Sequence, residues 1–169
     1  DPNDGSGSLV ATITLGGMPD VRRVNAIDFS PNGQLYGVGT VGNNWVLATI
    51  DCITGQATTV GLLGLSAGQG RAVTDINFDS QGRLWAYYNT PDNMDVLGTV
   101  NIATGAFSSI GFTGLNDIGN GLAFARFLED DLYHAGYQKL STLSTMTGNA
   151  TTVANPLVFL FGSLNTPRI

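Results

Sequence analysis

The sequence has few charged side chains and almost none of the residue types that most often carry chemistry. Charged residues make up 12% of the 169 positions, about half of the usual share of roughly 25%. Lysine, cysteine and histidine occur once each. Seven basic residues and a net charge of −6 argue against a nucleic-acid binder, which needs a basic surface to displace counterions. A single cysteine excludes an intrachain disulfide framework and a cysteine-rich zinc site.

No apolar run approaches the roughly 20 residues that a membrane-spanning helix needs. The longest run, residues 156–162, has the length of a strand. Apolar residues nevertheless make up 43% of the chain, enough to build a core. Threonine, serine, asparagine and glycine stand where many proteins use lysine and glutamate, a composition typical of secreted and cell-surface β proteins. We therefore expect a folded protein without a membrane span, located outside the cell.

What the sequence does contain is an internal repeat, with a period of roughly 40–50 residues that is typical of propeller blades. The first half of each unit is an apolar run that ends in phenylalanine, followed by a turn and a Leu-aromatic pair. The second half is another apolar run, followed by a Thr-Gly turn. The phenylalanines, Leu-aromatic pairs and turn glycines are Phe29, Phe78 and Phe124; Leu35-Tyr36, Leu84-Trp85 and Leu132-Tyr133; and Gly55, Gly105 and Gly148.

Each unit divides into four strand-like runs. In the first unit, residues 24–29 alternate at period two, a turn rich in Pro, Asn and Gly follows, and further runs start at residue 35 and cover 46–51 and 57–60. The Asp51 side chain can bond the backbone of the hairpin turn that follows it. No stretch of ten residues has helical periodicity with caps. The sequence therefore predicts an all-β fold of β-propeller type, built from four-stranded antiparallel blades.

We interpret the whole chain as one propeller-like repeat domain. Its units cover about 24–70, 71–120 and 121–162, which gives three full blades within residues 1–169, and partial blade strands at 8–15 and 163–169 remain at the two ends. Propellers usually have four to eight blades. The end pieces can combine into one hybrid blade, several chains can join edge to edge, or the chain can be part of a longer protein.

The repeat reads Asp-Phe-x-x-x-Gly-x-Leu-Tyr-Gly, then Leu-x-x-Ile-Asp-x-x-Thr-Gly-x-Ala-Thr-x-Val-Gly. Over residues 24–154 this pattern resembles a repeat of bacterial secreted and surface β-propeller proteins. The resemblance implies a propeller with an extracellular address and no catalytic activity. The third unit departs from the pattern, because Glu129-Asp-Asp replaces its glycine turn and Ser144 stands where Asp51 and Asn101 stand.

The sequence indicates no catalytic centre, and we expect no enzyme. A Ser-His-Asp or Cys-His arrangement would have to use His134, the only histidine, which has no nucleophile motif near it. Cys52 has no adjacent cationic residue to activate its thiol. The incomplete blade count favours instead a structural or interaction module that forms a homo-oligomer or polymer through open blades and edge strands, such as 9–14 and 158–162.

An alternative function is carbohydrate binding, in the manner of tachylectin-like propeller lectins. Tyr36, Trp85 and Tyr133 share one repeat position and are expected to lie between blades. Other aromatic residues flank the variable loops between second and third strands, where an exposed ring can stack on a sugar and nearby amides can bond its hydroxyl groups. The expected ligand-binding residues are Trp45, Tyr87, Tyr88, Asn93 and Tyr137.

Calcium is the one cofactor that the sequence suggests. It prefers several oxygen ligands, and the best set is Asp92, Asn93 and Asp95 in the variable loop of the second unit. A calcium-dependent, lactonase-like propeller hydrolase is the least supported alternative. Such an enzyme needs several converging acids and a base, of which the sequence gives no sign.

Overall fold

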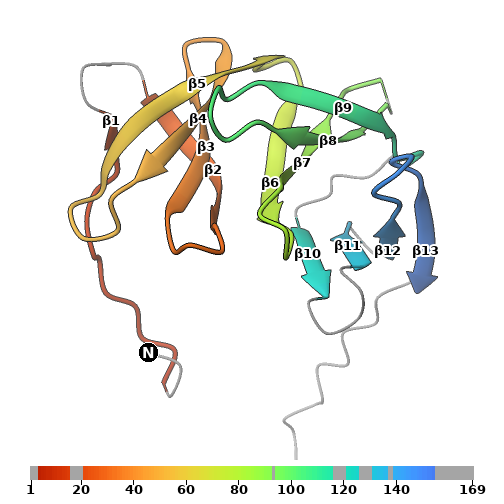
Figure 1. Cartoon of the computed structure of the whole chain (residues 1–169). Helices are drawn as coiled ribbons and strands as arrows, with labels where there is room; N and C mark the ends of the chain where they lie inside the picture. The colour runs from red at the N-terminus through yellow and green to blue at the C-terminus, as the bar shows by residue number, and fades with distance from the viewer. Residues whose placement is uncertain are drawn as a thin grey trace, which may run out of the picture.

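The computed structural model describes residues 4–15, 21–92, 94–115, 121–125, 131–136 and 139–154. These residues form three sheets that follow one another along the chain (Figure 1). The predicted all-β, propeller-type fold with four-stranded antiparallel blades is confirmed. Within the described ranges, no helix is long and apolar enough to cross a membrane.

Each blade is a meander in which every strand pairs antiparallel with the next strand along the chain. The first blade contains β2 (Val21–Phe29), β3 (Leu35–Val41), β4 (Asn44–Ile50) and β5 (Gln56–Ser66). The second contains β6 (Ala72–Phe78), β7 (Leu84–Asn89), β8 (Val96–Val100) and β9 (Phe107–Phe112). The third contains β10 (Gly121–Ala125), β11 (Asp131–Ala135), β12 (Leu140–Leu143) and β13 (Ala150–Ala154).

The hairpin turn between the third and fourth strands has the same design in every blade. One polar side chain at its start accepts hydrogen bonds from the backbone of the turn: Asp51 from Ile53 and Thr54 at 2.9 and 2.8 Å, and Asn101 from Ala103 at 2.9 Å. In the third blade the Ser144 hydroxyl takes this place. The hydrogen bonding that the sequence predicts for Asp51 is therefore confirmed. Ser144, which stands at this repeat position in the third blade, is also a hydrogen-bond acceptor.

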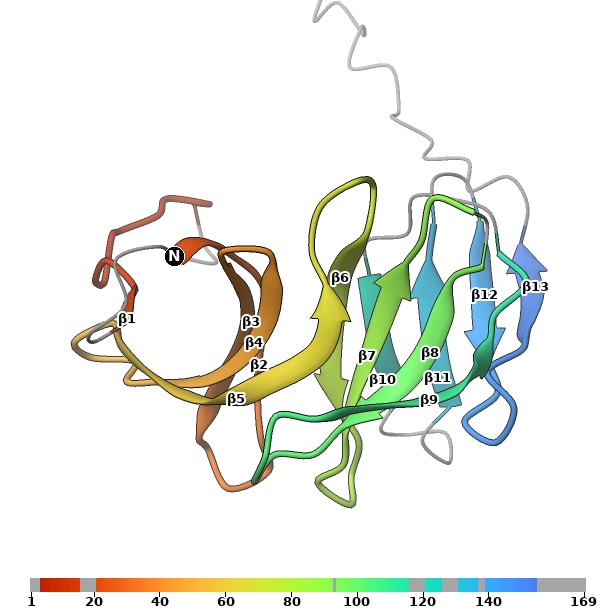
Figure 2. The same ribbon diagram turned by 90° about the horizontal axis from the view of Figure 1, so that it is seen from above.

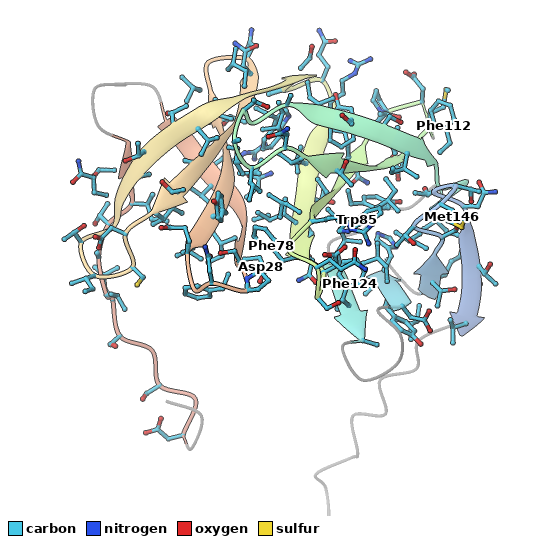
Figure 3. All side chains as sticks on the ribbon, viewed as in Figure 1. Asp28, Phe78, Trp85, Phe112, Phe124 and Met146 are labelled. Atoms are coloured by element: carbon cyan, nitrogen blue, oxygen red, sulfur yellow. The ribbon has the colours of Figure 1, made fainter. Side chains whose placement is uncertain are left out.

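The blades pack face to face, and we call the side of a blade toward the preceding blade its front face and the opposite side its back face. Tyr36 on the back of the first blade lies against Phe78 on the front of the second, with ring centroids 5.4 Å apart. One blade later, Trp85 meets Phe124 in the same way at 6.1 Å (Figure 3). The prediction that Tyr36 and Trp85 lie between blades is confirmed.

The first strands of the three blades, β2, β6 and β10, run beside one another and are joined by side-chain hydrogen bonds. Asp28 accepts a hydrogen bond from the Phe78 N–H at 2.7 Å, and Asn77 accepts one from the Phe124 N–H at 3.2 Å. In both bonds the N–H of the repeated phenylalanine donates to an acid or amide side chain of the preceding blade. This ladder is a second repeating contact between blades.

A third repeating contact joins the outer strands. The turn around Gly105 lies on Gly61 of β5, and the turn around Gly148 lies on Gly111 of β9. A Cβ atom at Gly61 would lie 2.0 Å from the Thr104 carbonyl oxygen, and one at Gly111 would lie 2.1 Å from the Thr147 carbonyl oxygen. At these two junctions glycine permits the close approach, because a Cβ atom would overlap the opposing carbonyl oxygen in the present backbone positions.

The chain start does not form the full strand expected at 8–15. Only β1 (Thr14–Leu15) is a strand, and it pairs parallel with the start of β5, as the fifth strand of the first sheet. Figure 2 shows β1 beyond the first blade, on the side away from the second blade. The partial strand predicted at 163–169 lies outside the described residues.

Candidate functional site: two open blade faces

The front face of the first blade has no blade against it in the described structure. Ile27 and Phe29, its two apolar residues on β2, are 53% and 49% exposed. The same repeat positions in the second blade, Ile76 and Phe78, are 1% and 0% exposed because the first blade covers them. Ile27 and Phe29 therefore stand at repeat positions that a preceding blade covers in the second blade, but no described blade covers them here.

The outer half of this front face is a close-packed apolar floor. Val46, Ala48 and Ile50 of β4 are buried there. A small apolar cavity lies over them and is lined on its other side by Ile13, from the residues before β1. The inner half of the face is thus open, whereas the chain start partly covers the outer half.

The back face of the third blade is the second open face. It carries Tyr133, which is half-buried, at the repeat position of Tyr36 and Trp85. Ala123 on β10 and Val153 on β13 are exposed on the same blade, Val153 by 56%. The described residues include no blade after the third, so the expectation that Tyr133 lies between blades stays a prediction.

Together the two faces hold the two halves of one unformed contact. Each existing junction pairs an aromatic ring on a back face with a phenylalanine on a front face. Tyr133 is such a ring without its phenylalanine, and Phe29 is such a phenylalanine without its ring. The arrangement is suited to recognising another blade of the same repeat.

Three of the expected sugar-binding residues are not surface residues, and that part of the prediction is wrong. Trp45 and Tyr87 are fully buried between blades, and Tyr88 is 8% exposed. Tyr87 stacks on His134 with ring centroids 4.2 Å apart, and the Tyr88 hydroxyl donates to the Ser66 carbonyl at 3.1 Å. Rings that pack in this way present no face to a sugar. Asn93 and Tyr137, the other two, lie outside the described residues.

The expected calcium ligands are also not assembled. Asp95 is 2% exposed, and its carboxylate accepts hydrogen bonds from the Thr90 N–H at 2.8 Å and from the Tyr87 hydroxyl at 3.3 Å. Asp92 instead points outward, with its carboxylate 3.9 Å from the Arg71 guanidinium. Across the described ranges, no three His, Cys, Asp or Glu side chains gather as a metal site would require.

His134 and Cys52 have ordinary structural surroundings. His134 is 1% exposed and lies in the junction between the second and third blades. Cys52 is an exposed free thiol in the β4–β5 turn. The His134 imidazole is therefore buried between two blades and stacked on a tyrosine ring.

Two side chains of β6 accept hydrogen bonds from the third blade, and one of them is a carboxyl group. Burial raises the pKa of Asp75, and the nearby charge of Asp28 adds to this effect, although the Leu122 and Ile76 N–H groups act against it. Asp75 accepts the Leu122 N–H at 2.6 Å. Two residues further along β6, the uncharged Asn77 side chain accepts a hydrogen bond from the Phe124 N–H in the same way. The ladder therefore uses both carboxylate and amide acceptors.

Comparison with known proteins supports the fold and nothing finer. No family model matches the sequence, and no curated protein does so either. A Bacteroides fragilis protein with a provisional assignment as a 6-phosphogluconolactonase is similar, with a TM-score of 0.52, 13% identity, and coverage of 78% of this chain and 39% of its own. A Bacteroides caccae protein of unknown function is similar with a TM-score of 0.53 and 12% identity, and the match covers 78% of this chain and 45% of that protein. The PQQ-bound aldose sugar dehydrogenase of Streptomyces coelicolor is similar with a TM-score of 0.50 and 17% identity, and the match covers 76% of this chain and 48% of the dehydrogenase.

This chain therefore spans less than half the length of each of these solved structures. Its three blades match a share of 39–48% of the longer chains. If blades are of similar length, the corresponding rings hold about six to eight blades, within the usual range for propellers. The two open faces are the places where the remaining blades of such a ring would pack.

Proposed function

We propose that this protein is a non-catalytic, extracellular β-propeller module whose copies associate head to tail. The back face of the third blade in one copy packs on the front face of the first blade in the next. The observation that carries the proposal is the divided aromatic pair, Tyr133 at one end and Phe29 at the other. Its extracellular address is supported by composition alone.

The exposed residues favour a second copy of the chain as the occupant. The contact would repeat a junction that the chain already makes twice, with Tyr133 in the place of Tyr36 and Trp85. Covering the exposed parts of Ile27 and Phe29 would contribute on the order of 2 kcal/mol. Such head-to-tail contacts close into a ring when the rotation permits and otherwise continue as a filament. Two copies contain six blades, a number found in closed propellers.

Sedimentation velocity over a range of concentrations tests this proposal. The expected species is a dimer of 35.4 kDa, twice the chain mass of 17.7 kDa, in equilibrium with monomer. Higher multiples would show the open, filament form of the same contact. A monomer at every concentration would contradict the proposal.

The same experiment has a gain-of-function arm at Ala123. This residue occupies the repeat position of Asp28 and Asn77, so the third blade offers no acceptor for the Phe29 N–H of a second copy. Ala123→Asn supplies one across the contact. Because the Phe29 N–H already donates to the Asp28 carboxylate at 2.9 Å in the single copy, the net gain is at most about 1 kcal/mol, which should tighten association up to about fivefold. Ala123→Leu is the control of similar size without an acceptor. Equal affinity of the Asn and Leu variants would contradict the predicted position of this hydrogen bond.

A further inference from the structure

Residues 11–15 lie beside the first blade in the same way that β5 and β9 lie beside the blades that follow them. At each junction the glycine of a β-hairpin turn sits on the backbone of the preceding outer strand. A Cβ atom at Gly105 would lie 2.6 Å from the Gly61 oxygen, and one at Gly148 would lie 2.6 Å from the Gly111 oxygen. At Gly55 it would lie 2.4 Å from the oxygen of Thr12. Thr12 thus takes the place of Gly61 and Gly111.

Hydrogen bonds two residues further along join the same segments at the first and third blades, although donor and acceptor are exchanged between the two. The Ala150 N–H, at the start of β13, donates to the Thr113 carbonyl at 3.0 Å. At the first blade, Thr14 lies opposite Gln56 in parallel register and donates its N–H to the Gly55 carbonyl at 3.0 Å. Thr14 follows Thr12 by two residues, as Thr113 follows Gly111. Residues 11–15 therefore occupy the position of an outer strand from a blade that precedes the first one.

A complete blade that docks on the first blade brings its own outer strand to this position. In the head-to-tail contact proposed above, that strand is β13 of the second copy, whose Ala154 pairs with Leu140 as Gly61 pairs with Leu47 and Gly111 with Leu97. We call the position along Gly55–Ala57 the outer-strand site. Residues 11–15 and the partner's β13 cannot both fill it, because each would place its backbone in direct contact with the same Gly55 turn.

The chain start is held in the outer-strand site by few interactions. Its strand is two residues long. Leu9 and Val10 are 85% and 72% exposed, and Ile13, which covers the apolar floor, is 38% exposed. Segments with little buried apolar surface and few backbone hydrogen bonds open at low free-energy cost. The floor beneath Ile13, in contrast, is fully apolar, so its exposure to water is unfavourable when the chain start leaves it.

We infer that the outer-strand site is an exchange site, filled by residues 11–15 in the single copy and by strand β13 of a second copy in the assembly. The chain start then competes with association, because only the fraction of molecules with an empty site can bind. This inference rests on the proposed function, since it concerns the same contact between copies. It adds that the chain start sets the concentration at which copies associate.

Deletion of residues 1–15 is the first arm of the test, measured by sedimentation equilibrium. If the site is filled in nine-tenths or more of free molecules, the deletion should tighten association about tenfold or more. The second arm locks the segment in place with Thr14→Cys and Gln56→Cys, two exposed residues in register, in a Cys52→Ser background. Neighbouring strands lie about 4.8 Å apart, within the range that a disulfide spans. The oxidised protein should associate about tenfold more weakly than the same protein after reduction.

The outcomes separate this inference from the proposed function. If copies associate equally with and without residues 1–15, and equally in oxidised and reduced form, the exchange inference is overturned while the association stands. Weaker association after the deletion overturns the inference as well, because it makes the chain start part of the interface. If neither the full chain nor the deletion variant associates, the proposed function fails, and the inference fails with it.

Discussion

Alanine at position 29 is expected to weaken the association of copies by a factor of about 30 or more, while the monomer stays folded. Phe29 is half exposed in the single copy and becomes the buried centre of the proposed contact. Truncation of such a central aromatic residue costs about 2 kcal/mol or more in binding. The thermal midpoint of the monomer should change little, because no other blade covers this ring. Analytical ultracentrifugation and thermal unfolding measure the two effects separately.

Tyr133→Ala should reproduce this loss, and the double variant should lose less than the sum of the two single losses. Such a coupling is the signature of two residues in direct contact. Phe112→Ala is the matched control (Figure 3). Phe112 is 54% exposed, but it lies on the outer strand β9 of the second blade, which has a blade against each of its faces. If Phe112→Ala weakens association as much as Phe29→Ala does, the contact is a general apolar one and not the repeated blade junction.

Asp79→Ala is expected to destabilise the fold by about 3 kcal/mol. The Asp79 carboxylate is 1% exposed and accepts hydrogen bonds from the Arg83 N–H at 2.8 Å, the Arg83 guanidinium at 2.5 Å and the Trp85 indole at 3.0 Å. Its removal leaves several donors without their acceptor, each at a cost of about 1 kcal/mol or more. The Trp85 side chain would also lose the bond that fixes it in the junction with the third blade. Urea unfolding monitored by circular dichroism measures this loss.

The stabilising effect of Asp79 should depend on pH in a defined direction. Burial acts to raise the pKa of this carboxyl, but hydrogen bonds from Trp85 and Arg83 outweigh it, and the pKa lies below its usual range. The contribution is therefore present above the unfolded-state pKa of about 3.9 and is lost as the pH falls through the lower folded-state value. Asp79→Asn should show a smaller loss of stability than the native chain between neutral pH and pH 3.

Ser30 provides the control for this prediction. It holds the same turn position in the first blade, where its hydroxyl bonds the Gln34 backbone and no ion pair is involved. Ser30→Ala should cost about 1 kcal/mol at any pH. A pH-independent loss for Asp79→Ala of the same size as the loss for Ser30→Ala would contradict the assigned role of the carboxylate.

Local sequence signals predicted the blades well because the blade is defined by local rules. The turn residues, the alternation on β2 and the Thr-Gly hairpins act over a few positions, and the repeat multiplies each signal by three. The chain start was harder to predict. Residues 8–15 look like a strand in sequence, but only Thr14 and Leu15 find a pairing partner, and that partner is β5, more than 40 residues away.

Three of the expected sugar-binding residues are buried, because burial in a propeller depends on the neighbouring blade. Trp45 and Tyr87 stand beside variable loops in the sequence, which suggested exposure. In the fold both rings point into junctions with another blade, which the spacing along one strand cannot reveal. The residues of the proposed contact, Phe29 and Tyr133, are recognisable in the sequence as repeat positions. Phe29 is the first of the three repeated phenylalanines, and Tyr133 is the last of the three repeated aromatic residues that face a phenylalanine of the next blade. Residues at the two ends of such a repeat have no neighbouring blade among the described residues.

Mixing two variants that cannot associate on their own tests the head-to-tail contact most directly. Phe29→Arg blocks the front face, and Tyr133→Glu blocks the back face, so each variant alone should sediment as a monomer of 17.7 kDa. In a one-to-one mixture, the intact Tyr133 of one variant meets the intact Phe29 of the other, and the two substituted faces carry opposite charges. The mixture should therefore contain a 35.4 kDa dimer, twice the chain mass. A mixture that stays monomeric, or a single variant that still forms dimers, would contradict the proposal that copies join through these two faces.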